Sequence, residues 1–184
     1  MKEGEDLRMG RGKSKATQAK LLEENIQKVK YMLFNNQKDK DFRTFNGKGG
    51  EISQEDIIRS ILKKQDTFAV LPTGGGKSYC FQGPSFCFEG ITLVITPLVA
   101  LIQDQVKNFN SVYKKLHTRY KNGEEGITGS PYYQGELYRA IYPGMKNFSL
   151  KQLFDEIAHP HEWDEWDTEH KVQYKLLYVS PERL

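Results

Sequence analysis

Lys77 and Ser78 could together hold the phosphates of a nucleotide and a magnesium ion. They end a glycine-rich turn, residues 71–76, that follows the short apolar run 67–70. Glycines let a backbone come close to a ligand, and the N–H groups at the start of the next helix would point at an anion. Lys77 would reach the β- and γ-phosphates, and the Ser78 hydroxyl would reach a Mg²⁺ ion. The spacing predicts a phosphate-binding loop between a strand and a helix.

One position departs from the strict phosphate-loop pattern. That pattern has glycine six places before the lysine, where this chain has Leu71. A relaxed first position favours the loops of helicases. An ordinary glycine-rich turn before a helix is the simpler interpretation, and the Lys77-Ser78 pair argues against it.

Three apolar runs that each lead into a helix start predict an α/β fold with a mainly parallel sheet. The runs and their junctions are residues 67–70 before 71–78, residues 91–95 before Thr96-Pro97, and residues 175–179 before Ser180-Pro181. Apolar runs without alternation are typical of strands covered on both faces. If the strands are parallel, all three junctions lie along one edge of the sheet, where ligands bind in such folds. Thr96 is expected to cap the next helix, with Pro97 at its first position.

Helices are also expected ahead of the loop and directly after it. One begins near Ala16, and its packing partner stays open. A second is capped by Ser53 with Asp56 completing a capping box, which makes Gln54 the first helical residue. The residues alone favour a solvated Gln54. After the loop, a helix over residues 78–88 should kink or end at Gly83-Pro84.

Residues 110–172 are long and irregular, with a Gly- and Tyr-rich part over 120–142. Residues 151–170 hold seven acidic residues and one lysine, with Trp163 and Trp166 among them. Because this charge would repel a phosphate backbone, we interpret residues 120–172 as an acidic surface insertion that leaves a protein contact open. Asp155-Glu156-Ile157-Ala158-His159 has one residue too many for an Asp-Glu-x-His box and is rejected.

Composition narrows the class of protein. The 184 residues suit one domain, or one with a tail, and a net charge of +3 requires any nucleic-acid site to be local. No apolar run reaches a membrane span, and the charged N-terminus is unlike a signal sequence. Cys80 and Cys87, the only cysteines, are interpreted as reduced core thiols of an intracellular protein. His159, His161 and His170 lack the partners of a metal site.

Four stretches in order resemble the motifs of the RecQ family of superfamily 2 DNA helicases, across residues 42–184. They are Phe42-Arg43 with Gln54 (motif 0), residues 69–78 with Phe81-Gln82 (motif I), residues 94–106 (motif Ia) and residues 176–184 (motif Ib). The four in order are specific, and the Asp104-Gln105 ending of motif Ia favours RecQ over other helicases. The resemblance implies a partial RecA-like phosphate-loop NTPase domain.

The resemblance also implies ligands and roles. Lys77 would act on the γ-phosphate of ATP, Ser78 would hold Mg²⁺, and Gln54 with Arg43 would recognise adenine. Single-stranded DNA, or a duplex with a 3′ tail, would be the partner, and the location would be the cytoplasm and nucleoid, or a nucleus. The implied ATP-binding set is Arg43, Gln54, Thr73, Gly74, Gly75, Gly76, Lys77 and Ser78, and the implied DNA-binding set is Thr96, Pro97 and Ser180.

Two departures from the family pattern shape what we expect of the chain. Extra residues separate Arg43 from Gln54, and no Asp-Glu-x-His box or second RecA-like domain follows motif Ib in these 184 residues. Because of the missing box and second domain, we expect residues 41–184 to be the N-terminal part of the first motor domain. Residues 1–40 are expected to be a disordered lead-in with an amphipathic helix.

On this interpretation, the chain alone should neither hydrolyse ATP usefully nor unwind DNA. In the family topology, the strand that carries the box lies beside the phosphate-loop strand, so its absence would leave a gap and marginal folding. Another phosphate-loop ATPase, or a non-enzymatic nucleotide- or partner-binding protein, stays open.

Overall fold

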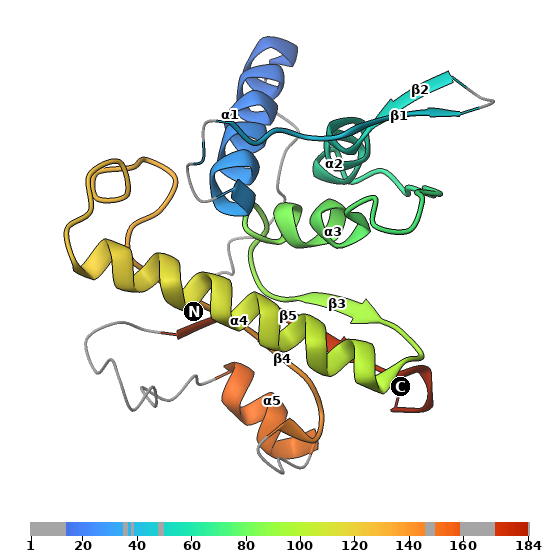
Figure 1. Cartoon of the computed structure of the whole chain (residues 1–184), viewed down its shortest axis with the longest axis vertical. Coiled ribbons are helices and arrows are strands. Elements are labelled where there is room, and N and C mark those ends of the chain that lie inside the picture. The colour runs from blue at the N-terminus through green and yellow to red at the C-terminus, as the bar shows by residue number, and fades with distance from the viewer. Residues whose placement is uncertain are drawn as a thin grey trace, which may run out of the picture.

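The computed structural model describes residues 14–34, 37, 39–47, 50–145, 150–158 and 172–183. Trp163, Trp166 and the three histidines 159, 161 and 170 lie outside these residues. The elements in order are α1 (Lys15–Phe34), β1 (Thr44–Gly47), β2 (Gly50–Ser53), α2 (Gln54–Leu62), α3 (Lys77–Ser85), β3 (Thr92–Ile95), α4 (Val99–Lys121), β4 (Leu137–Ile141), α5 (Leu150–Ala158), β5 (Val172–Val179) and a 3₁₀ turn (Pro181–Arg183), as Figure 1 shows.

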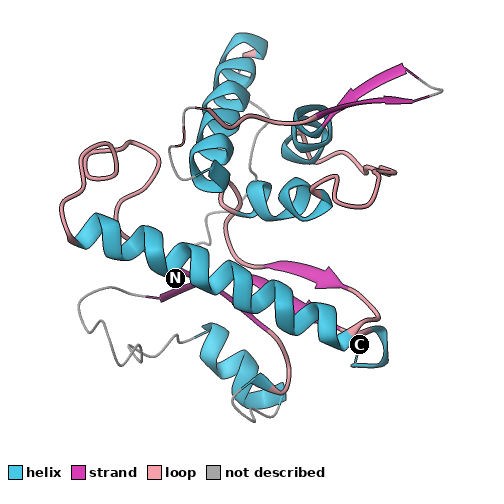
Figure 2. Ribbon diagram, in the orientation of Figure 1, coloured by secondary structure: helices cyan, strands magenta, loops and turns pink. Residues whose placement is uncertain are grey.

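A parallel three-stranded sheet with helices on its faces confirms the predicted α/β fold. The strand order is β3-β5-β4, with β5 in the middle (Figure 2). Alternate side chains of a strand point to opposite faces. Leu176 and Tyr178 of β5 therefore pack in the same core as α4, whereas Leu177 and Val179 pack in the core that Ile157 of α5 covers.

The strand expected before the phosphate loop does not form, so that prediction is wrong. Residues 65–72 have no regular structure, and the side chains of Phe68 and Val70 are 94% and 80% exposed. A strand satisfies its backbone groups by pairing with a neighbour, and none of the described strands pairs with this segment. The sheet ends at β3 instead.

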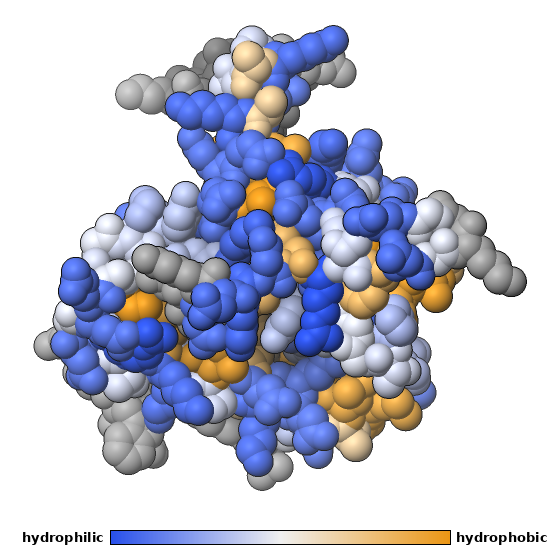
Figure 3. Space-filling model, turned by 45° about the horizontal axis from the view of Figure 1, so that its top comes forward, coloured by the Kyte–Doolittle hydropathy of each residue, from blue (hydrophilic) through white to orange (hydrophobic). Residues whose placement is uncertain are grey.

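Strand β3 is covered on one face only, contrary to the expectation of two buried faces. Val94 packs against the core under α4, whereas Leu93 and Ile95 are 48% and 54% exposed. Ile157 of α5 packs against Ile141, Leu177 and Val179 of β4 and β5, and among the described residues this cluster includes none of β3. Figure 3 shows that hydrophobic surface on one face of the molecule gathers in patches between hydrophilic side chains.

Helix α4 begins later and ends later than the sequence predicts. Leu98 holds the N-cap position, without a side-chain hydrogen bond, so Thr96 is not the cap and Pro97 is not the first helical residue. The Thr96 N–H instead donates to the Val179 carbonyl at 3.0 Å, which prolongs the pairing of β3 with β5. The pairing keeps Thr96 in the sheet ladder and moves the helix start to Val99.

The prediction that residues 110–172 are irregular is wrong where α4, β4 and α5 lie. Helix α4 continues to Lys121, and β4 forms the edge strand of the sheet, with Leu137, Ala140 and Ile141 buried. Gly135 and Pro143-Gly144 bound this run, which is a strand signal that could have been used. Asp155 lies on α5 rather than at the end of a strand.

Helices α1, α2 and α3 pack against one another as a layer. Helix α1 packs on α2 and α3 through Ile26, Val29 and Leu33 (Figure 1), which answers the question of its packing partner. At Gly83 an added Cβ would lie 2.6 Å from Val29 Cγ1, so glycine permits this close approach. Helix α3 ends at Ser85, one residue after Pro84, as Gly83-Pro84 predicts.

Both cysteines are free, and burial raises the pKa of the Cys80 and Cys87 thiols to about 11. They are therefore protonated at neutral pH. Within the described part of the chain, no helix combines the length and apolar character that crossing a membrane requires.

Candidate nucleotide-binding site

The glycine-rich loop has the backbone that an anion site needs. Gly74 and Gly76 have φ values of 73° and 70°, in the left-handed region that glycine adopts at little cost. Gly76 is the N-cap of α3, and no side chain caps this helix. The helix start therefore presents backbone N–H groups and the positive end of its dipole to an incoming anion.

Lys77 is folded back onto its own loop. Its Nζ donates to the carbonyl oxygens of Leu71 at 2.6 Å and Pro72 at 2.8 Å. The Gly75 N–H donates to the Pro72 carbonyl at 3.0 Å and closes the turn. A phosphate in the loop would offer the ammonium group a charged partner in place of two neutral carbonyls, and hydrogen bonds to charged groups are the stronger kind.

Gln54 is buried beside the loop rather than solvated, so the interpretation from residues alone is wrong. The side chain is 1% exposed. Its Nε2 donates to the carbonyls of Gly75 at 3.0 Å and Gly76 at 3.2 Å, and its Oε1 accepts from the Arg43 N–H at 2.9 Å. The confirmed capping box of Ser53 and Asp56 places Gln54 at the first position of α2, facing the loop.

Arg43 reaches the same loop despite the extra residues before Gln54. Its Nη1 donates to the Gly74 carbonyl at 2.9 Å. The extra residues contain the antiparallel pair β1 and β2, in which Thr44 lies opposite Ser53, and this pair projects from the molecule in Figure 1. A hairpin returns the chain to its starting point, so the insertion leaves Arg43 and Gln54 adjacent.

Ser78 lines a cavity of about 270 Å³ between α3 and α4. Across the same two helices, the Tyr178 hydroxyl donates to Gln105 Oε1 at 3.0 Å and accepts from Gln82 Nε2 at 3.3 Å. Tyr178 thereby joins three of the motifs, a role that local sequence patterns did not reveal. Within the described residues there is no group of three His, Cys, Asp or Glu side chains that could hold a metal ion.

The residues predicted to contact DNA meet at the ends of β3 and β5. Ile95 lies opposite Val179 in the parallel register, which makes Thr96 and Ser180 neighbours. Ser180 is buried, and Pro97 is exposed. The backbone and the Ser180 side chain hydrogen-bond the Glu182 carboxyl and lower its pKa, so the Ser180 hydroxyl already has a protein partner.

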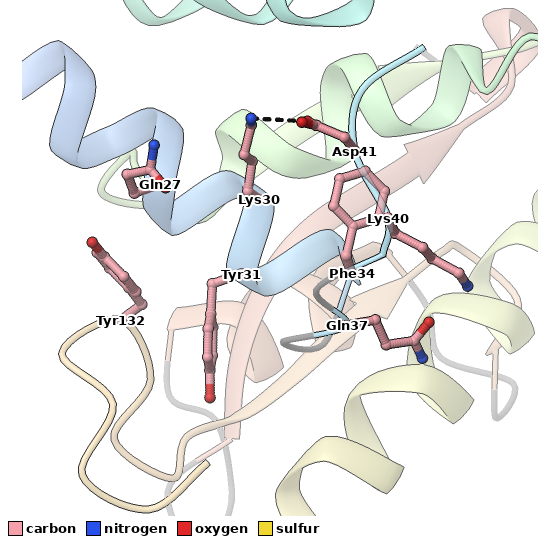
Figure 4. A pocket seen from close by; sticks show the side chains of 8 residues that line it. All are labelled: Gln27, Lys30, Tyr31, Phe34, Gln37, Lys40, Asp41 and Tyr132. Atoms are coloured by element: carbon pink, nitrogen blue, oxygen red, sulfur yellow. Dashed lines mark ion pairs between the residues drawn. The ribbon is translucent and has the colours of Figure 1, made fainter. Parts of the chain in front are cut away.

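A second cavity, of about 290 Å³, is lined by residues of α1, by residues of the segment that follows α1, and by Tyr132 (Figure 4). Lys30 and Asp41 form an ion pair of 2.8 Å at its wall, and the hydrogen bond from Lys30 lowers the pKa of Asp41. Tyr31 and Tyr132 add aromatic surface. None of the predicted site residues lines this cavity.

The sequence of residues 51–141 matches the DEAD/DEAH box helicase family. A probable ATP-dependent DNA helicase RecS of Bacillus subtilis is 34% identical over 131 residues, which cover 71% of this chain and 19% of the relative. An ATP-dependent DNA helicase RecQ of Haemophilus influenzae is 53% identical over 131 residues, which cover 71% of this chain and 16% of the relative. The chain belongs to the RecQ family of DEAD/DEAH box helicases.

A third relative, the ATP-dependent DNA helicase RecQ of Synechocystis, is 54% identical over 55 residues, or 30% of this chain and 12% of the relative. The chain thus spans less than a fifth of the length of these three relatives. The matched residues 51–141 include Gln54 and the phosphate loop, whereas Arg43 and Ser180 lie outside them. The RecQ family assignment confirms the predicted RecA-like phosphate-loop fold.

Proposed function

We propose that this chain binds ATP and Mg²⁺ as the nucleotide-binding part of a 3′→5′ DNA helicase of the RecQ type. The observation that carries the proposal is the loop itself. It has two left-handed glycines, an uncapped helix start and a lysine with its ammonium group on the loop. The names of the relatives, all ATP-dependent DNA helicases, support the same function.

In the proposed complex, Lys77 leaves the Leu71 and Pro72 carbonyls and binds the γ-phosphate, while Ser78 holds Mg²⁺. Thr73, Gly74, Gly75 and Gly76 surround the phosphates. Arg43 and Gln54 lie close to the loop, where they can contact adenine. Because both ends of the Gln54 amide already bond to the protein, reading a base would require Gln54 to exchange a loop or backbone partner for the base.

Thr96, Pro97 and Ser180 are proposed to line the track of single-stranded DNA. Their support is position: Thr96 and Ser180 follow directly on two paired parallel strands. The Thr96 N–H already donates to the Val179 carbonyl, so the Thr96 hydroxyl would make the contact with a backbone phosphate, without reading a base. A single strand, or a duplex with a 3′ tail, is the proposed partner, in the cytoplasm and nucleoid or in a nucleus.

We propose that residues 41–184 are the N-terminal part of the first motor domain, preceded by a lead-in over residues 1–40. Residues 120–172 carry the proposed acidic insertion and its protein contact, outside the β4 strand.

Titration with a fluorescent ATP analogue tests the proposal. The Lys77→Ala variant should bind the analogue at least about tenfold more weakly than the wild type, because it lacks a charge-assisted hydrogen bond to phosphate. Lys20→Ala, which removes an exposed lysine of α1, is the matched control and should bind as the wild type does. Equal affinity of the wild type and Lys77→Ala would overturn the phosphate-loop assignment.

Competition separates the proposal from a different phosphate-loop enzyme. ATP should displace the analogue more strongly than GTP, because Arg43 and Gln54 stand beside the loop to contact the base. Equal displacement by the two nucleotides would favour an enzyme of another class.

A further inference from the structure

Three consecutive carbonyls of the phosphate loop are held from outside by side chains of another segment. Arg43 Nη1 holds the Gly74 carbonyl, and Gln54 Nε2 holds those of Gly75 and Gly76. Gly76 also makes room for this contact, because a Cβ there would lie 2.4 Å from Gln54 Nε2. The loop is thus packed against α2 and the hairpin base on the side where its carbonyls point.

These hydrogen bonds to the carbonyls also orient the N–H groups on the opposite side of the loop, because of peptide geometry. The carbonyl of one residue and the N–H of the next belong to one planar trans unit and point in opposite directions. Holding the carbonyls of Gly74, Gly75 and Gly76 therefore fixes the directions of the N–H groups of Gly75, Gly76 and Lys77. The Gly75 N–H already donates to the Pro72 carbonyl, so the N–H groups of Gly76 and Lys77 are the ones that can face an anion in such a loop.

The hairpin ties Arg43 and Gln54 together as a unit. Gln54 N–H donates to the Arg43 carbonyl at 2.9 Å, and Arg43 N–H donates to Gln54 Oε1 at 2.9 Å. These two bonds continue the pairing of Thr44 with Ser53 by one further step. Because the Gln54 residue already begins α2, its side-chain oxygen takes the place of a strand carbonyl.

We propose that Arg43 and Gln54, joined through the β1–β2 hairpin, are positioning residues for the phosphate loop and raise its affinity for phosphates whatever base is attached. The proposal rests on the proposed nucleotide binding of residues 71–78. It differs from adenine recognition, because a residue that only reads the base has no effect on a ligand that lacks one.

Two ligands separate these roles. Dissociation constants for Mg²⁺-ATP and for Mg²⁺-tripolyphosphate are measured by calorimetry on the wild type and on Gln54→Met, which keeps the side-chain length and removes its polar atoms. Losing about one net hydrogen bond to the loop corresponds to affinity about three- to tenfold lower. Tripolyphosphate should weaken by this factor, and ATP by at least as much, because Gln54 is also proposed to contact adenine. A loss for ATP with unchanged tripolyphosphate affinity would overturn the proposal and leave Gln54 as a base reader.

Controls keep the outcome interpretable. Gln27→Met makes the same chemical change at an exposed position of α1 and should leave both affinities unchanged. If Gln54→Met does not fold, Arg43→Lys serves instead, because Arg43 is exposed and its charge is kept while the reach to the Gly74 carbonyl is lost. This variant should also weaken tripolyphosphate, and ATP by at least as much, and unchanged tripolyphosphate affinity would again count against the proposal. A wild type that binds neither ligand would contradict the proposed function itself.

Discussion

Residues 67–70 and residues 176–179 are both apolar runs that lead into a turn with proposed ligand-binding residues, yet only the second is a strand. Tyr178 is fully buried, whereas Val70 is 80% exposed. Strand β5 lies between two parallel neighbours, and residues 67–70 have none among the described strands. The comparison shows that pairing partners, rather than local composition, decide which of two similar runs becomes a strand.

The phosphate loop nevertheless keeps its turn without a strand before it. Its support comes from the helical layer: Gln54 of α2 and Arg43 at the hairpin base hold its carbonyls, and α3 packs on α1 at Gly83. The two parts of the molecule therefore position their proposed ligand-binding residues by different means. The sheet places Thr96 and Ser180, and side-chain hydrogen bonds place the loop.

The largest effect should come from the paired strand. Val179→Ala in β5 removes two buried methyl groups, at about 0.8 kcal/mol each plus a cavity term, so unfolding free energy should fall by about 2 kcal/mol. Val70→Ala makes the same change at an exposed site and should stay within about 0.5 kcal/mol of the wild type. Urea unfolding followed by circular dichroism measures both. Equal losses in the two variants would show that residues 67–70 are paired after all.

A smaller effect should follow at the helical support of the loop. Gly83→Ala places a methyl group 2.6 Å from Val29 Cγ1 and 3.0 Å from Leu33 Cδ1. Overpacking of this kind costs typically about 1–3 kcal/mol, which outweighs the gain of about 1 kcal/mol from replacing a helical glycine. Thermal unfolding should therefore show a lower midpoint. A raised midpoint would mean that α1 and α3 are not in tight contact.

The smallest effect should appear at the start of α2, next to Gln54. Hydrogen bonds from the Ser53 backbone and hydroxyl lower the pKa of the Asp56 carboxyl. A carboxyl with a lowered native pKa stabilises the fold above its ordinary value of 3.8 and loses this contribution as the pH falls through the native value.

Ser53→Ala should reduce this acid dependence, measured as the difference in urea midpoint between pH 6 and pH 3, because the hydroxyl no longer bonds the carboxylate. The loss of the cap should also cost about 1 kcal/mol or less at pH 6, at the exposed end of the measured range. An unchanged acid dependence would show that the capping box does not form in solution.

Sequence patterns correctly predicted the structures that depend on residues close together in the chain. The capping box needs only Ser53 and Asp56, three residues apart, and it forms as expected. The periodic apolar residues of α1 and the β-rich run of β5 likewise became the helix and strand that they predict. In each of these cases the deciding neighbours are close in sequence or the run is fully buried.

Contacts between distant residues explain the failures. Strand β4 is short and set among glycines and tyrosines, and its identity depends on pairing with β5 more than thirty residues later. The burial of Gln54 depends on carbonyls of Gly75 and Gly76, 21 and 22 residues along the chain. The sequence did not predict that the β1–β2 hairpin brings Arg43 back to Gln54, because the pairing of β1 with β2 forms only in the folded chain.

Calorimetric titration of the 184-residue chain with Mg²⁺-ATP tests most directly whether residues 71–78 bind a nucleotide. We expect saturable binding of one nucleotide per chain, lost or strongly weakened in Lys77→Ala and preserved in Lys20→Ala. Absence of binding to the folded wild-type chain, or one-site binding that survives Lys77→Ala unchanged, would contradict the assignment of residues 71–78 as a nucleotide-binding loop.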